Sequence, residues 1–159
     1  GTVQDDLARR DFTVNALAVG LHATERDRLV DLFDGRGDLE RRLLRTPLDP
    51  SATFDDDPLR IMRTMRFAAQ LEFSVDPGVL TAAGAMRDRL AIVSQERIAD
   101  ELLKLMRVRR PSVGLQLMFD TGVLHVVFPE VAKLAGVDQR REYHHKDVFR
   151  HTMKVVVNI

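Results

Sequence analysis

The sequence contains no cysteine and no tryptophan, and it has no long hydrophobic run. The absence of cysteine excludes disulfide scaffolds, cysteine-ligated zinc sites and thiol nucleophiles, and it is compatible with a reducing compartment. No stretch approaches the roughly 18 apolar residues that cross a membrane, and residues 1–11 lack the basic-then-apolar pattern of a signal peptide. We therefore expect a soluble, cytoplasmic protein with no membrane partner.

The chain also lacks a net charge, because its 24 basic side chains match 24 acidic ones. This balance argues against a chain steered to nucleic acid by its overall charge, although local basic clusters can still contact phosphates. With 159 residues, 45% of them apolar, the chain can form one compact domain or two small ones. It begins with glycine, and its last residues, 147–159, have an apolar pattern typical of an interrupted helix, so we expect truncation at both ends.

The hydrophobic pattern divides the chain into a mixed part and a helical part. Residues 16–21 and 28–33 are short apolar stretches with β-branched side chains and predict two strands, with turn signals at Asp34-Gly35 and Gly37. Helical periodicity begins near residue 57, so residues 46–54 are expected to connect the two parts. The sequence thus predicts an α+β fold, in which a small α/β part precedes a mostly helical one.

The expected helices begin at a capping residue or a proline. The first has Asp57 as N-cap and Pro58 as its first residue, and it should end near residue 73. The other expected boundaries are at Asp76-Pro77-Gly78, at Ser94, and at Pro111 and Gly122, which bracket the fourth helix. Leu115 and Met118 are predicted to lie in the core of this helical part.

The densest cluster of polar residues lies at the start of the first expected helix. At about 100° per residue, Asp57, Arg60 and Arg63 fall within roughly a 120° sector of one face. A carboxylate and a guanidinium one turn apart offer an acceptor beside a donor, which complements the pairing edge of cytosine or adenine but not that of uracil or guanine. Arg66, farther round the helix, could add positive charge for phosphates. The alternative is an N-cap aspartate followed by ordinary surface ion pairs, which the spacing alone favours.

A second cluster occupies residues 5–16. Its two arginines, Arg9 and Arg10, adjoin Asp11 and could hold phosphate oxygens, while a carboxylate can accept from a ribose hydroxyl. The same residues would also be expected at an acidic helix N-terminus followed by a solvent-exposed run of charged side chains. Taken alone, this cluster favours the second explanation.

Four motifs occur in a fixed order over residues 5–106 and make one interpretation far more specific. They are Arg9-Arg10-Asp11-Phe12-Thr13-x-Asn15-Ala16, Asp31-x-x-x-Gly35-x-x-Asp38-Leu39, Asp57-Pro58-x-Arg60-x-x-Arg63-x-x-Arg66-Phe67 and Glu96-Arg97-Ile98-x-x-Glu101-Leu102-x-Lys104-Leu105. This order resembles the bacterial tRNA nucleotidyltransferase and poly(A) polymerase family, which includes the enzymes that add CCA to tRNA 3′ ends. The resemblance implies ATP and CTP as substrates and the tRNA 3′ end as partner. It also implies three regions: the end of a nucleotidyltransferase head over 1–46, a helical neck and tRNA-binding region over 47–138, and the start of a following helical domain of the His-Asp type over 139–159.

The resemblance also implies roles for individual residues. Arg10 would contact the nucleotide with Asp11 near the ribose, and Asp57 and Arg60 would read the base without a nucleic-acid template. Four further positions carry implied roles: Arg63 and Arg66 would assist with the nucleotide, Asp38 would belong to a flexible element that helps the site switch between CTP and ATP, and the segment at Glu96-Arg97 would buttress the base-reading helix. Asp56 replaces the usual glutamate of the base-reading motif, which leaves the reading pair intact.

One departure from the family pattern concerns catalysis. The family holds two Mg²⁺ ions with an Asp-x-Asp pair on a strand after a Gly-Gly loop. The only Asp-x-Asp here is Asp55 to Asp57, at an expected helix start without such a loop. We therefore expect Mg²⁺ to be held by carboxylates upstream of Gly1, no catalytic residue within this chain, and no activity of this chain alone.

Two further clusters have weaker functional interpretations. His151 resembles the first metal ligand of a His-Asp phosphohydrolase domain, but a complete metal site is not expected in this chain, and solvated loop histidines are the default. Lys104 and the basic residues of 107–110 could meet tRNA phosphates, although a basic helix C-terminus favoured by the helix dipole explains them more simply.

Three alternatives to CCA addition stay open at this point. A poly(A) polymerase would use the same motifs with ATP only. A noncatalytic RNA-binding module would bind RNA without incorporating nucleotides. A phosphohydrolase with its active part downstream would show metal-dependent phosphatase activity that does not depend on Asp57.

Overall fold

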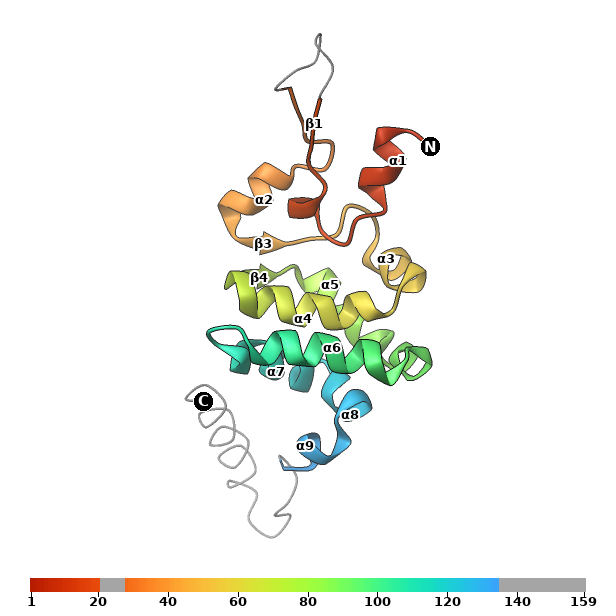
Figure 1. Ribbon diagram of the computed structural model, residues 1–159, viewed down its shortest axis with the longest axis vertical. Coiled ribbons are helices and arrows are strands. Elements are labelled where there is room, and N and C mark those ends of the chain that lie inside the picture. The colour runs from red at the N-terminus through yellow and green to blue at the C-terminus, as the bar shows by residue number, and fades with distance from the viewer. Residues whose placement is uncertain (21–27, 135–159) are drawn as a thin grey trace.

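The computed structural model describes residues 1–20 and 28–134 of the chain. The molecule is elongated, and its elements are stacked along the long axis in approximate chain order, as Figure 1 shows. The N-terminal elements form the upper part, α4 and α6 cross the middle, and α8 and α9 lie below. The fold is α+β and mostly helical, as the sequence predicts.

The upper part combines short helices with short strands. Its elements are helix α1 (Val3–Ala8), the 3₁₀ turn η1 (Thr13–Asn15), strands β1 (Ala18–Val19) and β2 (Leu29–Val30), helix α2 (Gly35–Arg41) and strand β3 (Leu43–Leu44). The two predicted strands are confirmed as an antiparallel pair, with Ala18 opposite Val30, but they are shorter than expected.

Helix α2 replaces the turns that the glycines of residues 34–37 predict. The carboxylate of Asp31 accepts hydrogen bonds from the backbone N–H groups of Gly35 (2.7 Å) and Arg36 (3.0 Å), so a residue outside the helix caps it. Gly35 is required by a close approach, because a Cβ atom there would lie 2.2 Å from the carbonyl oxygen of Thr13. The glycine thus allows a helix to pack tightly against η1.

The expected connection over residues 46–54 is wrong in part, because helix α3 (Pro50–Asp56) begins within it. Asp49 accepts from the backbone N–H of Ser51 (2.8 Å), and Pro50 occupies the first turn. Phe54 is fully buried, so the helix is held by the core as well as by its cap. The Asp-Pro pair is the signal that could have revealed it.

The remaining elements are helix α4 (Leu59–Leu71), strand β4 (Ser74–Val75), helix α5 (Pro77–Ala85), the 3₁₀ segment η2 (Arg87–Ile92), and helices α6 (Gln95–Met106), α7 (Pro111–Asp120), α8 (Val123–Val127) and α9 (Pro129–Lys133). The starts of α4, α5, α6 and α7 follow the predicted boundaries, whereas no start was predicted for η2, α8 or α9. Helix α4 begins one residue later than expected, and the Asp57 carboxylate still accepts from the N–H of Leu59 (3.1 Å). It ends before the expected residue because Glu72 adopts a left-handed conformation (φ 54°).

The main core lies where α4, α6 and α7 meet. Ile61 and Met65 of α4, Leu105 of α6 and Met118 of α7 are each at most 1% exposed, and the predicted core position of Met118 is confirmed, as is that of Leu115. A smaller cluster of Phe12, Leu44 and Ala68 joins the upper part to α4, and strand β3 pairs in parallel with β4, with Leu43 opposite Ser74. These contacts fix residues 9–15 against the polar face of α4.

No helix in the part of the chain that the structure describes is long and apolar enough to cross a membrane. The expected third region, over residues 139–159, and His151 within it lie outside the described residues.

Candidate functional site

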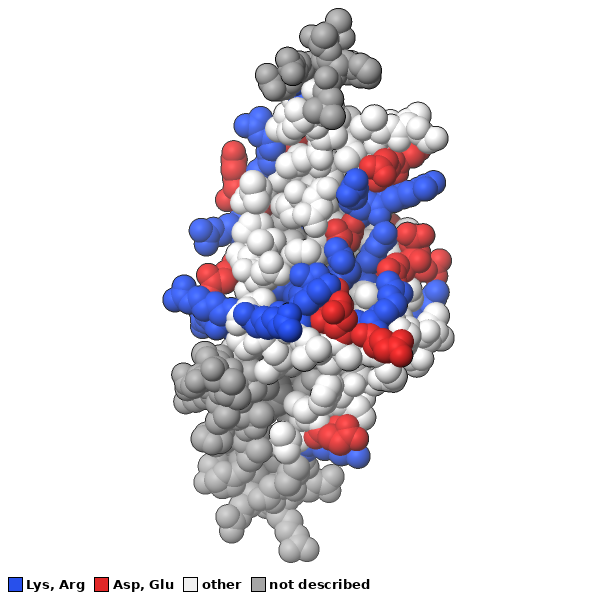
Figure 2. Space-filling view, in the orientation of Figure 1, with Lys and Arg blue, Asp and Glu red and all other residues white. Residues whose placement is uncertain are grey.

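A polar cavity of about 560 Å³ lies where residues 9–15 meet α4 and α6. Its volume falls within the range typical of small-molecule sites. Figure 2 shows that charged side chains gather in a band across the middle of the molecule, where these elements meet. The cavity is lined by Arg9, Arg10, Asp11, Asn15, Asp57, Leu59, Arg60, Arg63 and Arg97.

The charge of this lining favours an anionic ligand. It contains five arginines and two aspartates, so it carries an excess of positive charge. Guanidinium groups bind phosphate oxygens through pairs of N–H donors, and they stay charged at any working pH. The cavity is therefore suited to a ligand that combines phosphates with a polar group for the aspartates.

Asp57 is held by donors on both oxygens. Its Oδ1 accepts from the N–H of Leu59 at 3.1 Å, and its Oδ2 accepts from Nη2 of Arg97 at 2.9 Å. Arg97 lies in the first turn of α6, which Ser94 caps by accepting from the Arg97 N–H. The predicted cap at Ser94 is thereby confirmed, and the carboxylate of Asp57 has one fixed orientation with about a third of the side chain exposed.

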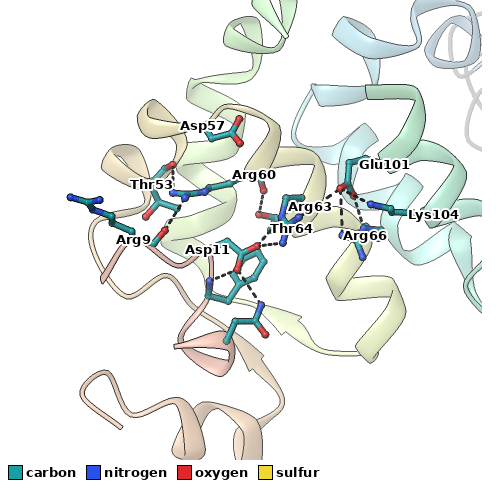
Figure 3. Close-up of polar contacts among 12 residues, drawn as sticks. Arg9, Asp11, Thr53, Asp57, Arg60, Arg63, Thr64, Arg66, Glu101 and Lys104 are labelled. Carbon is teal, nitrogen blue, oxygen red and sulfur yellow. Dashed lines mark hydrogen bonds and ion pairs between the residues drawn. The ribbon is translucent and has the colours of Figure 1, made fainter. Parts of the chain in front are cut away.

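Arg60 is held by helix α3 and by the residue that follows α1. Its Nη2 donates to the carbonyl oxygen of Arg9 (2.8 Å), and its Nη1 donates to that of Thr53 (3.2 Å) and forms an ion pair with Asp56 (3.2 Å). Figure 3 shows this guanidinium reaching from α4 toward Arg9 and Thr53. Because only 18% of the side chain is exposed, Arg60 presents its remaining donors to the cavity in a restricted geometry.

Asp11 and Arg63 join the upper part to α4. Arg63 donates from Nε to Oδ2 of Asp11 (2.8 Å), its Nη2 forms an ion pair with the same oxygen (2.6 Å), and Figure 3 shows the two side chains pointing toward each other. Asp11 is 7% exposed, and its Oδ1 accepts from the N–H of Phe12 and from Asn15. The predicted positions Arg10, Asp11, Asp57, Arg60 and Arg63 therefore meet at one cavity.

Arg66 is not part of this cavity, in contrast to the expectation. It is 8% exposed and donates to the buried Glu101 of α6, from Nε at 2.5 Å and from Nη2 at 3.4 Å. The physical reason is helical drift: nine residues after Asp57, the side chain has turned by about half a circle and faces α6. Arg66 therefore acts on the packing of α4 against α6, where Figure 3 shows it beside Glu101.

Asp38 lies in the first turn of α2 and is fully buried. Its carboxylate accepts from Oγ1 of Thr13 (2.5 Å), Nη2 of Arg41 (2.6 Å) and Nε of Arg45 (3.0 Å). Arg41 also donates to Asp34 and thereby lowers the pKa of that carboxyl. The structure thus shows Asp38 as a firmly held helix residue, and movement of this segment during nucleotide exchange stays a prediction.

The described residues do not form a metal site. No group of three or more histidine, aspartate or glutamate side chains gathers within residues 1–20 and 28–134. The two ends of the Asp-x-Asp segment also diverge, because Asp55 pairs with Arg89 (2.6 Å) while Asp57 pairs with Arg97. These carboxylates do not fit the pair of Mg²⁺ ions that the family resemblance implies.

The basic cluster after α6 is exposed. Lys104 pairs with Asp100 one turn earlier (2.9 Å), and Arg107 forms the C-terminal cap of the helix. Arg109 and Arg110 follow in the turn before α7. Both the helix-dipole interpretation and the phosphate interpretation are compatible with this position.

Three polar residues of the cavity were not among the predicted nucleotide-binding residues: Arg9, Asn15 and Arg97. Asn15 belongs to the first of the four motifs, four residues after Asp11, and this membership is the sequence feature that could have identified it. Arg97 was expected only to buttress α4, and its direct contact with Asp57 depends on how α6 packs against α4, which no local pattern encodes.

Two family models match the chain. One, described as the poly A polymerase head domain, matches residues 1–45, and the other, described as a probable RNA and SrmB-binding site of polymerase A, matches residues 72–134. Together they cover most of the described residues.

Curated proteins and solved structures agree with these matches. The chain is 45% identical over 103 residues to a CCA-adding enzyme of Limosilactobacillus fermentum (65% of this chain, 25% of that protein) and 39% identical over 148 residues to a multifunctional CCA protein of Xylella fastidiosa (90% and 34%). It superposes with a TM-score of 0.76 and 30% identity on the Bacillus stearothermophilus CCA-adding enzyme in complex with CTP, covering 93% of this chain and 34% of that one. The chain thus spans about a quarter to a third of the length of these curated relatives. The ordered motifs, both family models and the shared fold place the chain in the family of bacterial tRNA nucleotidyltransferases and poly(A) polymerases.

Proposed function

We propose that this chain is the nucleotide-selecting part of a template-independent nucleotidyltransferase that adds CMP and AMP to the 3′ ends of tRNA. In that reaction the tRNA 3′-hydroxyl attacks the α-phosphate of CTP or ATP and pyrophosphate leaves. The observation that carries the proposal is that Asp57 and Arg60 are both held at one arginine-rich cavity. The solved relatives include CCA-adding enzymes in complex with CTP and with ATP, which supports these two nucleotides as ligands.

Base selection in this proposal depends on the order of donor and acceptor. The Asp57 carboxylate accepts from the exocyclic amino group of cytosine or adenine, and Arg60 donates to the neighbouring ring nitrogen. Uracil and guanine present the opposite order and would place two acceptors or two donors face to face. A well-placed pair of hydrogen bonds discriminates between bases by about 1–3 kcal/mol.

The arginines of residues 9–10 supply the phosphate contacts. Arg10 is about half exposed, and among the described residues its guanidinium pairs with the exposed Asp6 (3.1 Å), which a phosphate can replace at little cost. Arg9 lines the same cavity while its carbonyl oxygen holds Arg60. The phosphate-binding segment and the base-reading residue are therefore linked by one hydrogen bond.

The proposal keeps the three regions that the family resemblance implies. Residues 1–46 would be the end of the catalytic head, 47–138 the neck and tRNA-binding region, and 139–159 the start of a further helical domain. Mg²⁺ would be bound by carboxylates outside the described residues, because those described form no suitable pair. We expect that this chain alone incorporates no nucleotide.

The test is nucleotide binding by calorimetry, with CTP, ATP, UTP and GTP. The chain should bind CTP and ATP more tightly than the other two, and Asp57→Ala should remove this preference while keeping the shared phosphate affinity. Asp55→Ala is the matched control, because Asp55 is two residues away, exposed and paired with Arg89 outside the cavity. Equal binding of all four nucleotides by the unmodified chain would refute the proposal.

Two other candidate functions give different results in this assay. A poly(A) polymerase, favoured by the description of the matched head domain, would bind ATP but not CTP at the Asp57 site. A noncatalytic RNA-binding module, favoured by the description of the second match, would bind RNA through residues 72–134 and show no base preference for free nucleotides. A binding series with four nucleotides and one RNA separates the three functions.

A further inference from the structure

The aromatic ring of Phe67 lies against two arginines of its own helix, α4. The guanidinium carbon of Arg66 is 4.4 Å from the centre of the ring, and that of Arg63 is 5.4 Å from it. Both distances are within the range, up to about 6 Å, in which the negative face of an aromatic ring attracts a cation. Phe67 is half-buried, so water screens this attraction only in part.

The ring of Phe67 is itself held by the upper part of the molecule. It makes an edge-to-face contact with Phe12, with ring centres 5.6 Å apart and an angle of 79° between the planes. Phe12 is fully buried and directly follows Asp11 in the chain. Phe67 therefore contacts both Arg63 and the segment that Arg63 holds through Asp11.

The two arginines beside the ring are directed to different carboxylates. Arg66 donates from Nε to Glu101 (2.5 Å), whereas Arg63 donates from Nε to Asp11 (2.8 Å). Glu101 is also within reach of Arg63, because Nη1 of Arg63 lies 3.9 Å from its Oε1. Figure 3 shows Arg63 between the two carboxylates. Arg63 thus has two possible partners and pairs closely with one of them.

We propose that Phe67 is a positioning residue, whose aromatic face keeps Arg63 on Asp11 and thereby fixes the phosphate-binding segment at the cavity. The inference rests on the proposed nucleotide site and adds to it a residue that does not line the cavity. Arg9 and Arg10 directly precede Asp11 in the chain. If Arg63 shifted toward Glu101, this segment would be held less firmly, and a nucleotide would have to order it on binding.

The experiment compares Phe67→Leu with Phe67→Tyr in calorimetric titrations with CTP, UTP and inorganic triphosphate. Leucine is apolar but has no negative face, whereas tyrosine keeps that face. Phe67→Leu should weaken the binding of all three ligands by about threefold, because the affected segment contacts phosphate. The ratio of the CTP and UTP affinities should not change, and Phe67→Tyr should bind like the unmodified chain. Phe73→Leu is the matched control, because Phe73 packs against the same small cluster but does not line this cavity.

A double-mutant cycle with Arg63→Gln separates positioning from packing. In the Arg63→Gln background, Phe67→Leu should cause no further loss of triphosphate affinity, because the arginine through which the ring acts is gone. It should still lower the midpoint of urea denaturation, since the contacts of the ring with Phe12 and Arg66 are lost in either background.

The inference and the proposed function fail in different ways. An equal loss of triphosphate affinity in both backgrounds, or equally weak binding by Phe67→Leu and Phe67→Tyr, would overturn the inference and leave base selection intact. Equal affinities of the unmodified chain for CTP and UTP would refute the proposed base selection, and the triphosphate titrations would then still decide the role of Phe67.

Discussion

Replacing Arg97 with alanine should weaken base selection without altering Asp57 and Arg60, the two residues proposed to read the base. Arg97 donates to Oδ2 of Asp57 at 2.9 Å, and the N–H of Leu59 then remains as the only described donor that holds the carboxylate. Without Arg97 the carboxylate can rotate about the bond to its Cβ, and it must give up this freedom whenever cytosine or adenine binds. The loss should appear in the preference for CTP over UTP, because a base without the amino group gains nothing from an oriented acceptor.

The magnitude follows from the exposure of the pair. Hydrogen bonds to charged groups contribute about 1.5–3 kcal/mol when buried, and fully exposed ion pairs contribute about 0.2–1 kcal/mol. The side chains of Arg97 and Asp57 are 52% and 32% exposed, which places this contact near the boundary between the two classes. A loss of about 1 kcal/mol corresponds to about a fivefold decrease in the CTP-to-UTP affinity ratio.

The assay is competition between CTP and UTP at equal ionic strength, with Arg89→Ala as the control. Arg89 forms a comparably exposed ion pair with Asp55 (2.6 Å) on the same part of the molecule but outside the cavity. Arg97→Lys should recover part of the selectivity, because an ammonium group can still donate to the carboxylate. If Arg97→Ala lowers the affinities for CTP and UTP by the same factor, Arg97 contributes only charge, and the reasoning about orientation is refuted.

Two further predictions concern stability. Glu101→Gln should lower the free energy of unfolding by about 3 kcal/mol, measured by urea denaturation, because it leaves the buried guanidinium of Arg66 without its carboxylate; Glu96→Gln, at an exposed position of the same helix, should change it by less than about 1 kcal/mol. Gly114→Ala should destabilise by about 1–3 kcal/mol, because the added Cβ would lie 2.8 Å from a carbonyl oxygen of α4, whereas Gly78→Ala, which meets only a surface side chain, should have little effect. An undiminished midpoint for either Glu101→Gln or Gly114→Ala would contradict the packing of α4 against α6 and α7 described above.

The sequence predicted those helices whose boundaries carry their own signals. Ser94 accepts from a backbone N–H in its own first turn, and Pro77 and Pro111 occupy first turns where a missing N–H costs nothing, so these starts depend on a few adjacent residues. Helix α2 differs because its cap, Asp31, lies four residues before it and because its glycines serve a tertiary contact with Thr13. A local pattern of glycines indicates a turn, and only the packed structure shows why they belong to a helix.

The candidate site was predictable to the extent that one helix face determines it. The spacing of Asp57, Arg60 and Arg63 placed three side chains on a common face, and the structure brings all three to the cavity. The same periodicity could not exclude Arg66 from the cavity. Residue spacing gives the angle of a side chain around the helix, but it does not tell which element packs against the helix at that angle. Both partners come from α6: Glu101 forms an ion pair with Arg66, and Arg97 forms one with Asp57. Their roles therefore follow from tertiary packing.

Two arginines of α4, Arg60 and Arg63, join the upper part of the molecule to α4 at the cavity. Arg60 donates to the carbonyl oxygen of Arg9, and Arg63 forms a hydrogen bond and an ion pair with Asp11, so consecutive turns of α4 hold the two ends of a three-residue segment. Arg10 lies between these two attachments and lines the cavity. In the proposed complex, a phosphate bound by Arg10 would be kept at a fixed distance from a base read by Asp57 and Arg60, since a shift of the segment would break its bonds to α4. On this proposal, a base attached to no phosphate would lose the contacts of Arg10 and would bind more weakly than the whole nucleotide.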